Sequence, residues 1–362
     1  METAPKPHKA EKPLIIPIFI MNSGCPQHCI FCNQKIAAGN FTHEITKNVF
    51  DGEVASYLRW NKDKLGGIEI AFYGGSFTGL PPDYQKRLLS WADTYIQKGQ
   101  VDSIRISTRP DYLGDDQLIF LHRYGVRTIE LGAQSFNDEV LRFAGRGHNA
   151  QVTVKAITLL KAHGFKTGLH LMAGLPHDTR EIFMETLART VELQPDTARI
   201  HPVLVFQDTP LADEFREGRY QPLSLDESVE WCCLAWEKLV PEGIRIIRFG
   251  LQTTPEMKQE GAVLAGPFHL SFGSLVYSAI FYSATLKLLR DIPKHVRKLH
   301  FQIAERDLSN FRGFNNSNIE AIKKLYPDAQ IVIDSHGNGL NGHLLMTTES
   351  GKSFSLDIPG LM

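Results

Sequence analysis

Short apolar runs alternate along the chain with longer stretches in which apolar positions recur at helical spacing. The apolar runs are rich in β-branched residues and predict strands at Leu14–Met21, Ile68–Tyr73, Ser103–Ser107, Thr128–Leu131, Gly168–Met172, Arg199–Val205 and Arg245–Phe249. The helical stretches lie at His43–Trp60, Pro82–Gln97, Asp115–His122, Asn137–Phe143, Gln151–Ala162, Thr179–Glu192 and Leu225–Leu239. This alternation predicts βαβ units and a parallel sheet.

Right-handed crossovers leave two architectures for such units, an open doubly wound sheet and a TIM-type barrel. The number of successive units favours the barrel. We therefore expect an α/β fold, a partial TIM-type (β/α)6 barrel over residues 14–255, after a disordered leader at 1–13. Residues 256–362 predict a small α/β extension with a helix at Leu275–Leu289, a strand–helix–strand unit and a hairpin after a Gly/Asn-rich turn.

Composition supports a globular protein without a strong global field. Of 362 residues, 43% are hydrophobic and 22% charged, so a core can form and wholesale disorder is excluded. The net charge of −1 draws the whole molecule neither to nucleic acid nor to a membrane. The most apolar stretch, Ser274–Leu289, is ended early by Lys287 and Arg290, so we expect no membrane span and a cytoplasmic location.

The unusual residues follow the predicted strands. In a parallel α/β sheet the loops after the carboxyl ends of the strands form the functional edge. Five such loops converge there, and they contain Cys25–Cys32, Gly74–Gly79, Thr108–Arg109, Gly132–Ser135 and Ala173–Pro176.

The first loop has the spacing C-x3-C-x2-C, formed by Cys25, Cys29 and Cys32. Five cysteines in all, an odd number, argue against a disulfide framework, and three thiolates so close favour zinc or an iron–sulfur cluster. Alternatives are a structural zinc with His28 or a distant residue as fourth ligand, and three unrelated free thiols. Cys232 and Cys233 fit a core helix better than a fourth-ligand position.

Three further loops contain groups suited to a polar cofactor. The glycine pair Gly74–Gly75 lets the backbone approach a ligand closely, with an ordinary βα turn as the alternative. Gln134 can hydrogen-bond ribose hydroxyls. Arg146 can grip a carboxylate with two hydrogen bonds, with a surface ion pair as the alternative.

The cysteine motif, with Phe31 before its last cysteine, resembles the signature of the radical SAM superfamily. The resemblance implies that Cys25, Cys29 and Cys32 ligate a [4Fe-4S] cluster whose open iron binds S-adenosylmethionine (SAM). It also implies cofactor-binding roles for Phe31, Gly74, Gly75, Ser76, Gln134, Arg146 and His170, with Arg146 at the methionine carboxylate and Gln134 at the ribose. A lone strand histidine such as His170 is otherwise more often a core residue.

Segments such as His170–Pro176, Arg199–Val205 and Ile246–Gln252 are similar to the branch containing oxygen-independent coproporphyrinogen oxidase and the catalytic subunit of Elongator. The extension shows no Gly-rich turn of the acetyl-CoA-binding type. We therefore expect no acetyltransferase domain and do not carry over wobble-uridine chemistry. Ser76 departs from the family's glycine-rich pattern.

The extension also has a local basic excess. Residues 287–324 contain nine Lys/Arg and four Asp/Glu, and Arg312–Ile322 is similar to the loop and helix of a KH module, although Asn316 replaces the second loop glycine. The alternatives are an RNA contact and a small cap on the barrel.

Two functions follow. The first is a radical SAM enzyme in which an external electron donor reduces the cluster and SAM yields a 5′-deoxyadenosyl radical. That radical removes hydrogen from a substrate, either a tRNA base or a small metabolite. The alternative is a non-catalytic iron–sulfur or zinc protein that binds RNA or a protein partner.

Overall fold

The computed structural model describes residues 13–20, 25, 29–38, 44–59, 66–336 and 342–360. Apart from Pro13, the predicted leader lies outside the described residues. So do His28 and most of the Gly/Asn-rich turn. The chain divides into two compact units, one formed by residues 1–170 and 254–262 and the other by residues 171–253 and 263–362.

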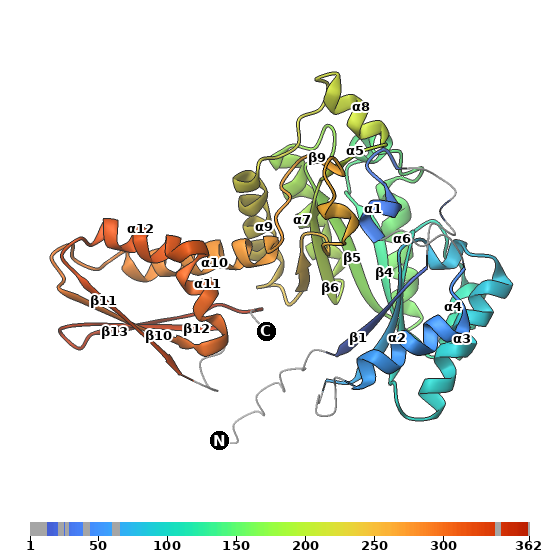
Figure 1. Ribbon diagram of the computed structural model, residues 1–362, viewed down its shortest axis with the longest axis horizontal. Helices are drawn as coiled ribbons and strands as arrows, with labels where there is room; N and C mark the ends of the chain where they lie inside the picture. The colour runs from blue at the N-terminus through green and yellow to red at the C-terminus, as the bar shows by residue number, and fades with distance from the viewer. Residues whose placement is uncertain are drawn as a thin grey trace. The chain divides into compact units, whose positions relative to one another are not determined.

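The main sheet has the strand order β1-β2-β3-β4-β5-β6-β8 (Figure 1). Its strands are β1 (Leu14–Phe19), β2 (Ile68–Tyr73), β3 (Ser103–Thr108), β4 (Val126–Gln134), β5 (Lys166–Ala173), β6 (Thr197–Pro202) and β8 (Arg245–Phe249). The pairs β1–β2, β2–β3, β3–β4 and β6–β8 are parallel. The predicted partial TIM-type barrel is therefore confirmed, and its sheet contains seven strands.

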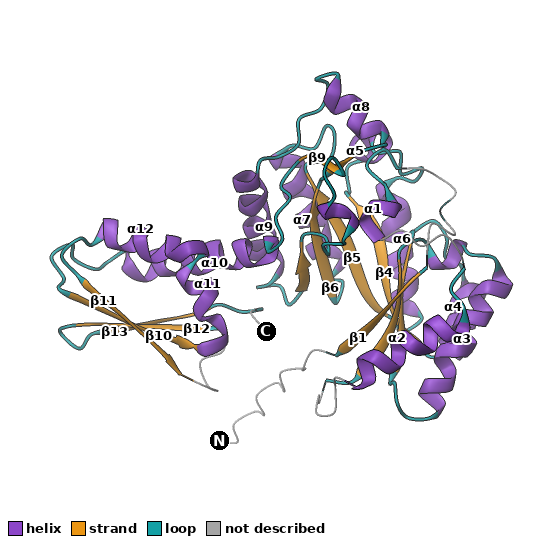
Figure 2. Cartoon of the chain, viewed as in Figure 1, coloured by secondary structure: helices purple, strands orange, loops and turns teal. Residues whose placement is uncertain are grey.

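Helices follow most of the strands (Figure 2). They are α1 (Gln34–Ala38), α2 (Lys47–Arg59), α3 (Pro82–Gln97), α4 (Asp115–Arg123), α5 (Asp138–Phe143), α6 (Ala150–Ala162), α7 (Arg180–Leu193), α8 (Pro210–Arg216) and α9 (Leu225–Leu239). The start of α9 shows why the helices begin where they do. Ser224 and Glu227 form a capping box there, which satisfies backbone N–H groups that have no partner within the helix.

Helix-facing residues of the first four strands form a dry core. Ile16, Ile70, Ile104 and Ile129 are all fully buried in the first unit. Strands covered on both faces are typical of parallel sheets, and this explains the near-continuous apolar runs in the sequence. The opposite faces of β2, β3 and β4 contain charged residues, which belong to the site described below.

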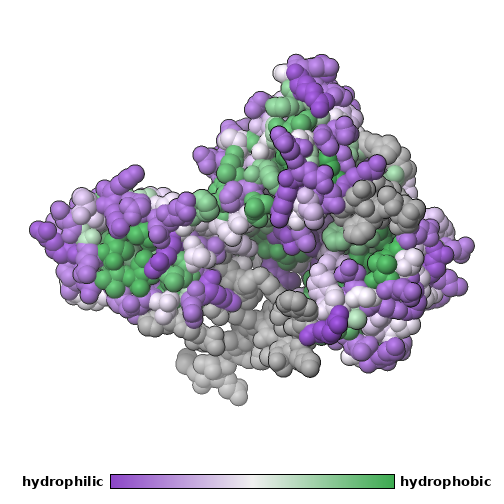
Figure 3. Space-filling model, in the orientation of Figure 1, coloured by the Kyte–Doolittle hydropathy of each residue, from purple (hydrophilic) through white to green (hydrophobic). Residues whose placement is uncertain are grey.

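The C-terminal elements form a four-stranded sheet in the order β11-β10-β12-β13. The elements are α10 (Phe272–Leu289), β10 (Lys298–Ala304), α11 (Leu308–Arg312), α12 (Ser317–Leu325), β11 (Gln330–His336), β12 (His343–Thr348) and β13 (Ser353–Asp357). The strand–helix–strand unit and the antiparallel hairpin β12–β13 match the expectation. Figure 3 shows an apolar area among polar side chains on the visible face of this part.

Among the described helices, α10 alone is long and apolar enough to cross a membrane by length and composition. Half of it is buried, and it contacts α9 and α11 within the second unit. Fully or largely buried side chains such as Val276 and Phe281 lie on several sides of the helix. A helix that is apolar all round is also typical of a protein core.

Candidate cofactor site at the carboxyl ends of the strands

Four of the five predicted loops belong to the first unit. Because β1, β2, β3 and β4 run parallel, the loops after their last residues lie at one edge of the sheet. That edge contains Cys25 and Cys29 after β1, Gly74 after β2, Thr108 at the end of β3 and Gln134 at the end of β4.

The cysteine loop is partly described. Cys25 is half-buried, Cys29 is buried and Cys32 is exposed. Phe31, which precedes Cys32, is half-buried. The amide of Cys32 donates to the carbonyl of Cys29 at 3.0 Å, which forms a tight turn. In the described part of the chain, no three His, Cys, Asp or Glu side chains are gathered closely enough to hold a metal ion.

Two guanidinium groups face the thiols. Nη1 of Arg146 donates to Sγ of Cys29 at 3.1 Å, although 117 residues separate the two in sequence. Burial and the neighbouring Cys29 raise the pKa of Cys25, and the charges of Arg109 and Arg146 oppose that rise. The net shift of the Cys25 pKa is nevertheless upward. The fit to an iron–sulfur cluster therefore rests on the donor type, three soft thiols in one short loop.

Arg146 is only 6% exposed, so it is not a surface ion pair. Besides Cys29, it donates through Nη2 to the carbonyl of Gly132. Its Nε is buried and has no hydrogen-bond partner within the described part of the chain. A buried donor without a partner is costly, so this nitrogen is suited to an anionic group such as a carboxylate.

Gln134 and Arg146 lie side by side around Gly132. A Cβ atom at Gly132 would stand 3.0 Å from Nε2 of Gln134 and 3.3 Å from Nη2 of Arg146, so a glycine leaves room for both side chains. Gln134 itself has a φ of 70°, in the left-handed region that side chains rarely adopt. Backbone strain of this kind concentrates at functional sites.

The glycine loop after β2 packs tightly on the end of β1. Gly74 has a φ of 94°, and a Cβ atom there would lie 3.3 Å from the carbonyl oxygen of Ile20. Gly75 is half-buried beside it. The buried Ser76 places its hydroxyl 2.8 Å from Oγ1 of Thr108, and the amide of Arg109 donates to the same hydroxyl at 3.2 Å. Ser76 therefore joins the second loop to the third.

Below this edge, a row of charges crosses the interior faces of four strands. Arg105 on β3 contacts Glu69 on β2 at 2.6 Å and Glu130 on β4 at 2.6 Å. Nε2 of His170 on β5 lies 2.6 Å from the other oxygen of Glu130. Burial alone would lower the pKa of Arg105, but the charges of Glu130 and Glu69 outweigh it and raise that pKa.

Sequence reasoning named His170 but missed Glu69, Arg105 and Glu130 as a group. The available signal was a single charge inside each apolar run, as in Ile68-Glu69-Ile70 and Ile104-Arg105-Ile106. A charge in a strand buried on both faces must point to the interior and find a partner there.

The loop after β5 belongs to the second unit. Oδ2 of Asp178 accepts from the amide of Gly174 at 3.0 Å, and the hydroxyl of Tyr220 donates to the carbonyl of Gly174 at 2.6 Å. Burial raises the pKa of Asp178 to about 7. These contacts fix the Gly174–Pro176 turn.

Known proteins resemble parts of the chain. It is 34% identical over 201 residues to the tRNA uridine(34) acetyltransferase of Methanocaldococcus jannaschii, and 29% identical over the same length to Elongator complex protein 3 of Homo sapiens. Each match covers 50% of this chain and only 37% of the relative. The uncharacterized protein YtqA of Bacillus subtilis is 28% identical over 222 residues, or 67% of its length.

A solved structure supports the fold. The archaeal Elp3 of Methanocaldococcus infernus, with residues 1–46 deleted, aligns at a TM-score of 0.58 and 22% identity, over 75% of this chain and 64% of that one. The family model for the radical SAM superfamily matches residues 19–190, and the family model for the Radical_SAM C-terminal domain matches residues 195–280. The chain therefore belongs to the radical SAM superfamily, whose enzymes use a [4Fe-4S] cluster and SAM for radical chemistry.

Proposed function

We propose that Cys25, Cys29 and Cys32 hold the [4Fe-4S] cluster and that Arg146 grips the methionine carboxylate of SAM. The observation that carries the proposal is the position of Arg146, which contacts the Cys29 thiol and keeps a buried Nε without a partner in the described structure. In this position the one arginine contacts a cluster ligand, Cys29, through Nη1 and binds the methionine carboxylate through Nε.

The other predicted residues complete the cofactor site in this proposal. Gln134 binds the ribose hydroxyls, and the backbone of Gly74, Gly75 and Ser76 receives the methionine amine. Phe31 and His170 lie toward the adenosyl group. When bound and reduced by an external electron donor, the cluster supplies an electron that splits SAM into methionine and a 5′-deoxyadenosyl radical. The protein orients the cofactor and keeps water away from the radical.

The substrate in this proposal is a tRNA base. Two of the relatives are named for acetylation of tRNA uridine 34, which motivates RNA over a small metabolite. The protein then acts in the cytoplasm, where the reduced state of its free cysteines is maintained.

A loop in the C-terminal part favours an RNA contact within residues 287–324. Phe314 is 60% exposed, and its ring meets only the edge of His269 among the described aromatic rings, at 5.8 Å between centroids. Gly313 has a φ of 77°, and the buried Asn318 amide donates to the carbonyl of Phe311 at 3.1 Å. The loop is therefore held in a shape that leaves an aromatic face exposed, suited to stacking on a base.

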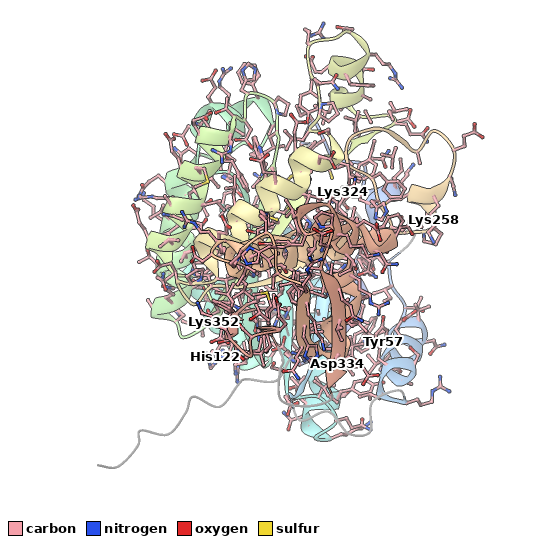
Figure 4. The ribbon with its side chains drawn as sticks, turned by 90° about the vertical axis from the view of Figure 1, so that its left-hand side faces the viewer. Tyr57, His122, Lys258, Lys324, Asp334 and Lys352 are labelled. Atoms are coloured by element: carbon pink, nitrogen blue, oxygen red, sulfur yellow. The ribbon has the colours of Figure 1, made fainter. Side chains whose placement is uncertain are left out.

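Positive side chains accompany this loop. Arg312 precedes Phe314 and is exposed, and the exposed Lys323 and Lys324 end α12. Figure 4 shows Lys324 on α12 and Asp334 on the sheet below it. Asp334 is paired with His300 at 2.6 Å, and Lys323 with Glu320 at 2.9 Å. Arg312 and Lys324 are therefore the cations that we assign to RNA phosphates in this proposal.

We expect Phe314→Ala to weaken binding of a labelled tRNA transcript by about 5- to 150-fold, because one base–aromatic stack contributes roughly 1–3 kcal/mol. Fluorescence anisotropy at fixed ionic strength measures the change. Ile119→Ala, which truncates another exposed apolar side chain, should bind as the wild type does. Equal affinity of Phe314→Ala and the wild type would remove this loop from the RNA contact.

Anaerobic reconstitution tests the cluster and SAM assignment. The wild type, loaded with iron and sulfide and mixed with dithionite and SAM, should form 5′-deoxyadenosine, and Cys29→Ala should form none because one cluster ligand is gone. Cys233→Ala is the matched control, since this thiol lies on α9 and donates to the carbonyl of Val276 at 3.9 Å. A colourless, zinc-loaded wild type would contradict the proposal.

A further inference from the structure

Arg109 is a buried arginine for which sequence analysis gave no role. It follows β3 and is only 3% exposed. Its Nε and Nη2 donate to the two carboxylate oxygens of Asp111 at 2.9 and 2.8 Å, which fixes the plane of the guanidinium. Its amide donates to Ser76, as described above. Both ends of the residue are therefore anchored.

The fixed guanidinium of Arg109 has a further acceptor. Nη2 also donates to the backbone carbonyl of Arg146, which belongs to the loop between α5 and α6. No other side-chain donor to this carbonyl is present among the described contacts. The bond therefore connects the third loop of the site to the loop that positions the cofactor-binding arginine.

The loop around Arg146 needs such a tether. Arg146 lies between Gly145, with a φ of 66°, and Gly147, with a φ of 71°. Glycines in this region give the backbone wide freedom, and fixing one residue costs roughly 1–2 kcal/mol. On its other side, the amide of Arg146 donates to the carbonyl of Leu141 at 3.0 Å. Arg109 thus holds the carbonyl end of a peptide segment whose amide end is held by α5.

We propose that Arg109 is a positioning residue that fixes the Arg146 backbone, and hence its guanidinium at Cys29. The inference rests on the proposed function for the cluster and SAM. The tether itself concerns the chain alone, since the bond from Arg109 to Arg146 exists without any cofactor.

Hydrogen exchange on the cofactor-free protein tests the tether. Arg109→Lys keeps the charge but cannot grip Asp111 with two bonds and reach the Arg146 carbonyl at once. We expect amide exchange in residues 145–149 to rise at least about tenfold over the wild type, because the loop regains the backbone freedom described above. Arg123→Lys, at an exposed position on α4, is the control. Unchanged exchange in Arg109→Lys overturns the positioning role.

The reconstituted protein tests the consequence for the cofactor. Arg109→Lys should weaken SAM binding about tenfold in anaerobic equilibrium dialysis, because the Arg146 guanidinium is no longer held in one position. Wild-type affinity in Arg109→Lys overturns the positioning of that guanidinium by Arg109.

The experiments distinguish a variant that does not fold from a proposed function that is wrong. Circular dichroism shows whether Arg109→Lys folds, and Asp111→Asn takes its place if it does not, since it loosens the Arg109 guanidinium without touching the thiol site. If the wild type assembles no cluster, the proposed function fails, while the exchange experiment still decides the tether. Faster exchange in Asp111→Asn supports the tether, and wild-type exchange overturns it.

Discussion

Arg146→Ala should lower the affinity for SAM by about 30- to 4,000-fold, the range given by roughly 2–5 kcal/mol for removing one partner of a buried charged hydrogen bond. The Nε of Arg146 is buried without a partner in the described structure, Nη1 donates to the thiol of Cys29, and in the proposed site Nε binds the methionine carboxylate of SAM. Loss of Arg146 would leave the methionine carboxylate of SAM without this partner in a buried site. Equilibrium dialysis of the reconstituted protein under anaerobic conditions measures the change.

Two variants give this result its meaning. Arg146→Lys keeps the charge but presents a point donor in place of a planar fork, so it should recover only part of the affinity. Arg142→Ala removes an exposed arginine four residues earlier, which lies over the ring of Phe143, and should bind SAM as the wild type does. If Arg146→Ala binds SAM with wild-type affinity while its cluster absorbance is intact, the carboxylate is held elsewhere.

The sheet could be predicted from sequence because its central strands are nearly continuous buried apolar runs, as in β2, while an edge strand such as β1 alternates buried and half-buried positions. Runs such as Ile68–Tyr73 and Arg245–Phe249 have the predicted bounds, and so do the amphipathic helices α3 and α9. The missed elements are short. The helices α1, α8 and α11 have five to seven residues each. They owe their existence to tertiary contacts, since so few residues give no reliable periodicity.

The candidate site also has residues that the sequence predicts and contacts that only the structure reveals. The cysteine motif is local, so its three positions could be read directly from the chain. The contact between Arg146 and Cys29 joins residues 117 positions apart, and no local pattern encodes it. Arg109 shows the same limit, because its partners Ser76 and Arg146 come from other loops that only the parallel sheet brings together.

The buried charges below the site cost free energy, and they also orient His170. Ions are expensive to bury, and they persist only where partners and geometry compensate. Arg105 has a carboxylate on each side, so its charge is neutralised and Glu130 keeps a second oxygen for His170. The orientation of the half-buried His170 therefore depends on Glu130, which Arg105 links to Glu69 on β2. Stability and site geometry are therefore coupled through Glu130.

That coupling predicts the largest stability effect. Glu130→Ala should destabilise the folded protein by about 3–5 kcal/mol, the usual cost of removing one partner from a buried ion pair. Glu130 is fully buried, and its loss deprives Arg105, His170 and the Tyr73 hydroxyl of an acceptor at once. Urea unfolding of the cofactor-free protein at pH 7, followed by circular dichroism, gives the free energy of unfolding.

Two comparisons separate burial of charge from mere loss of an ion pair. Glu192→Ala removes an exposed carboxylate paired with Arg189 and should change the free energy of unfolding by less than about 0.5 kcal/mol. Arg105→Met combined with Glu130→Ala should cost less than the sum of the single variants, because each single variant already removes the contact between Arg105 and Glu130. Strict additivity of the two would mean that the charges of Arg105 and Glu130 stabilise the barrel independently.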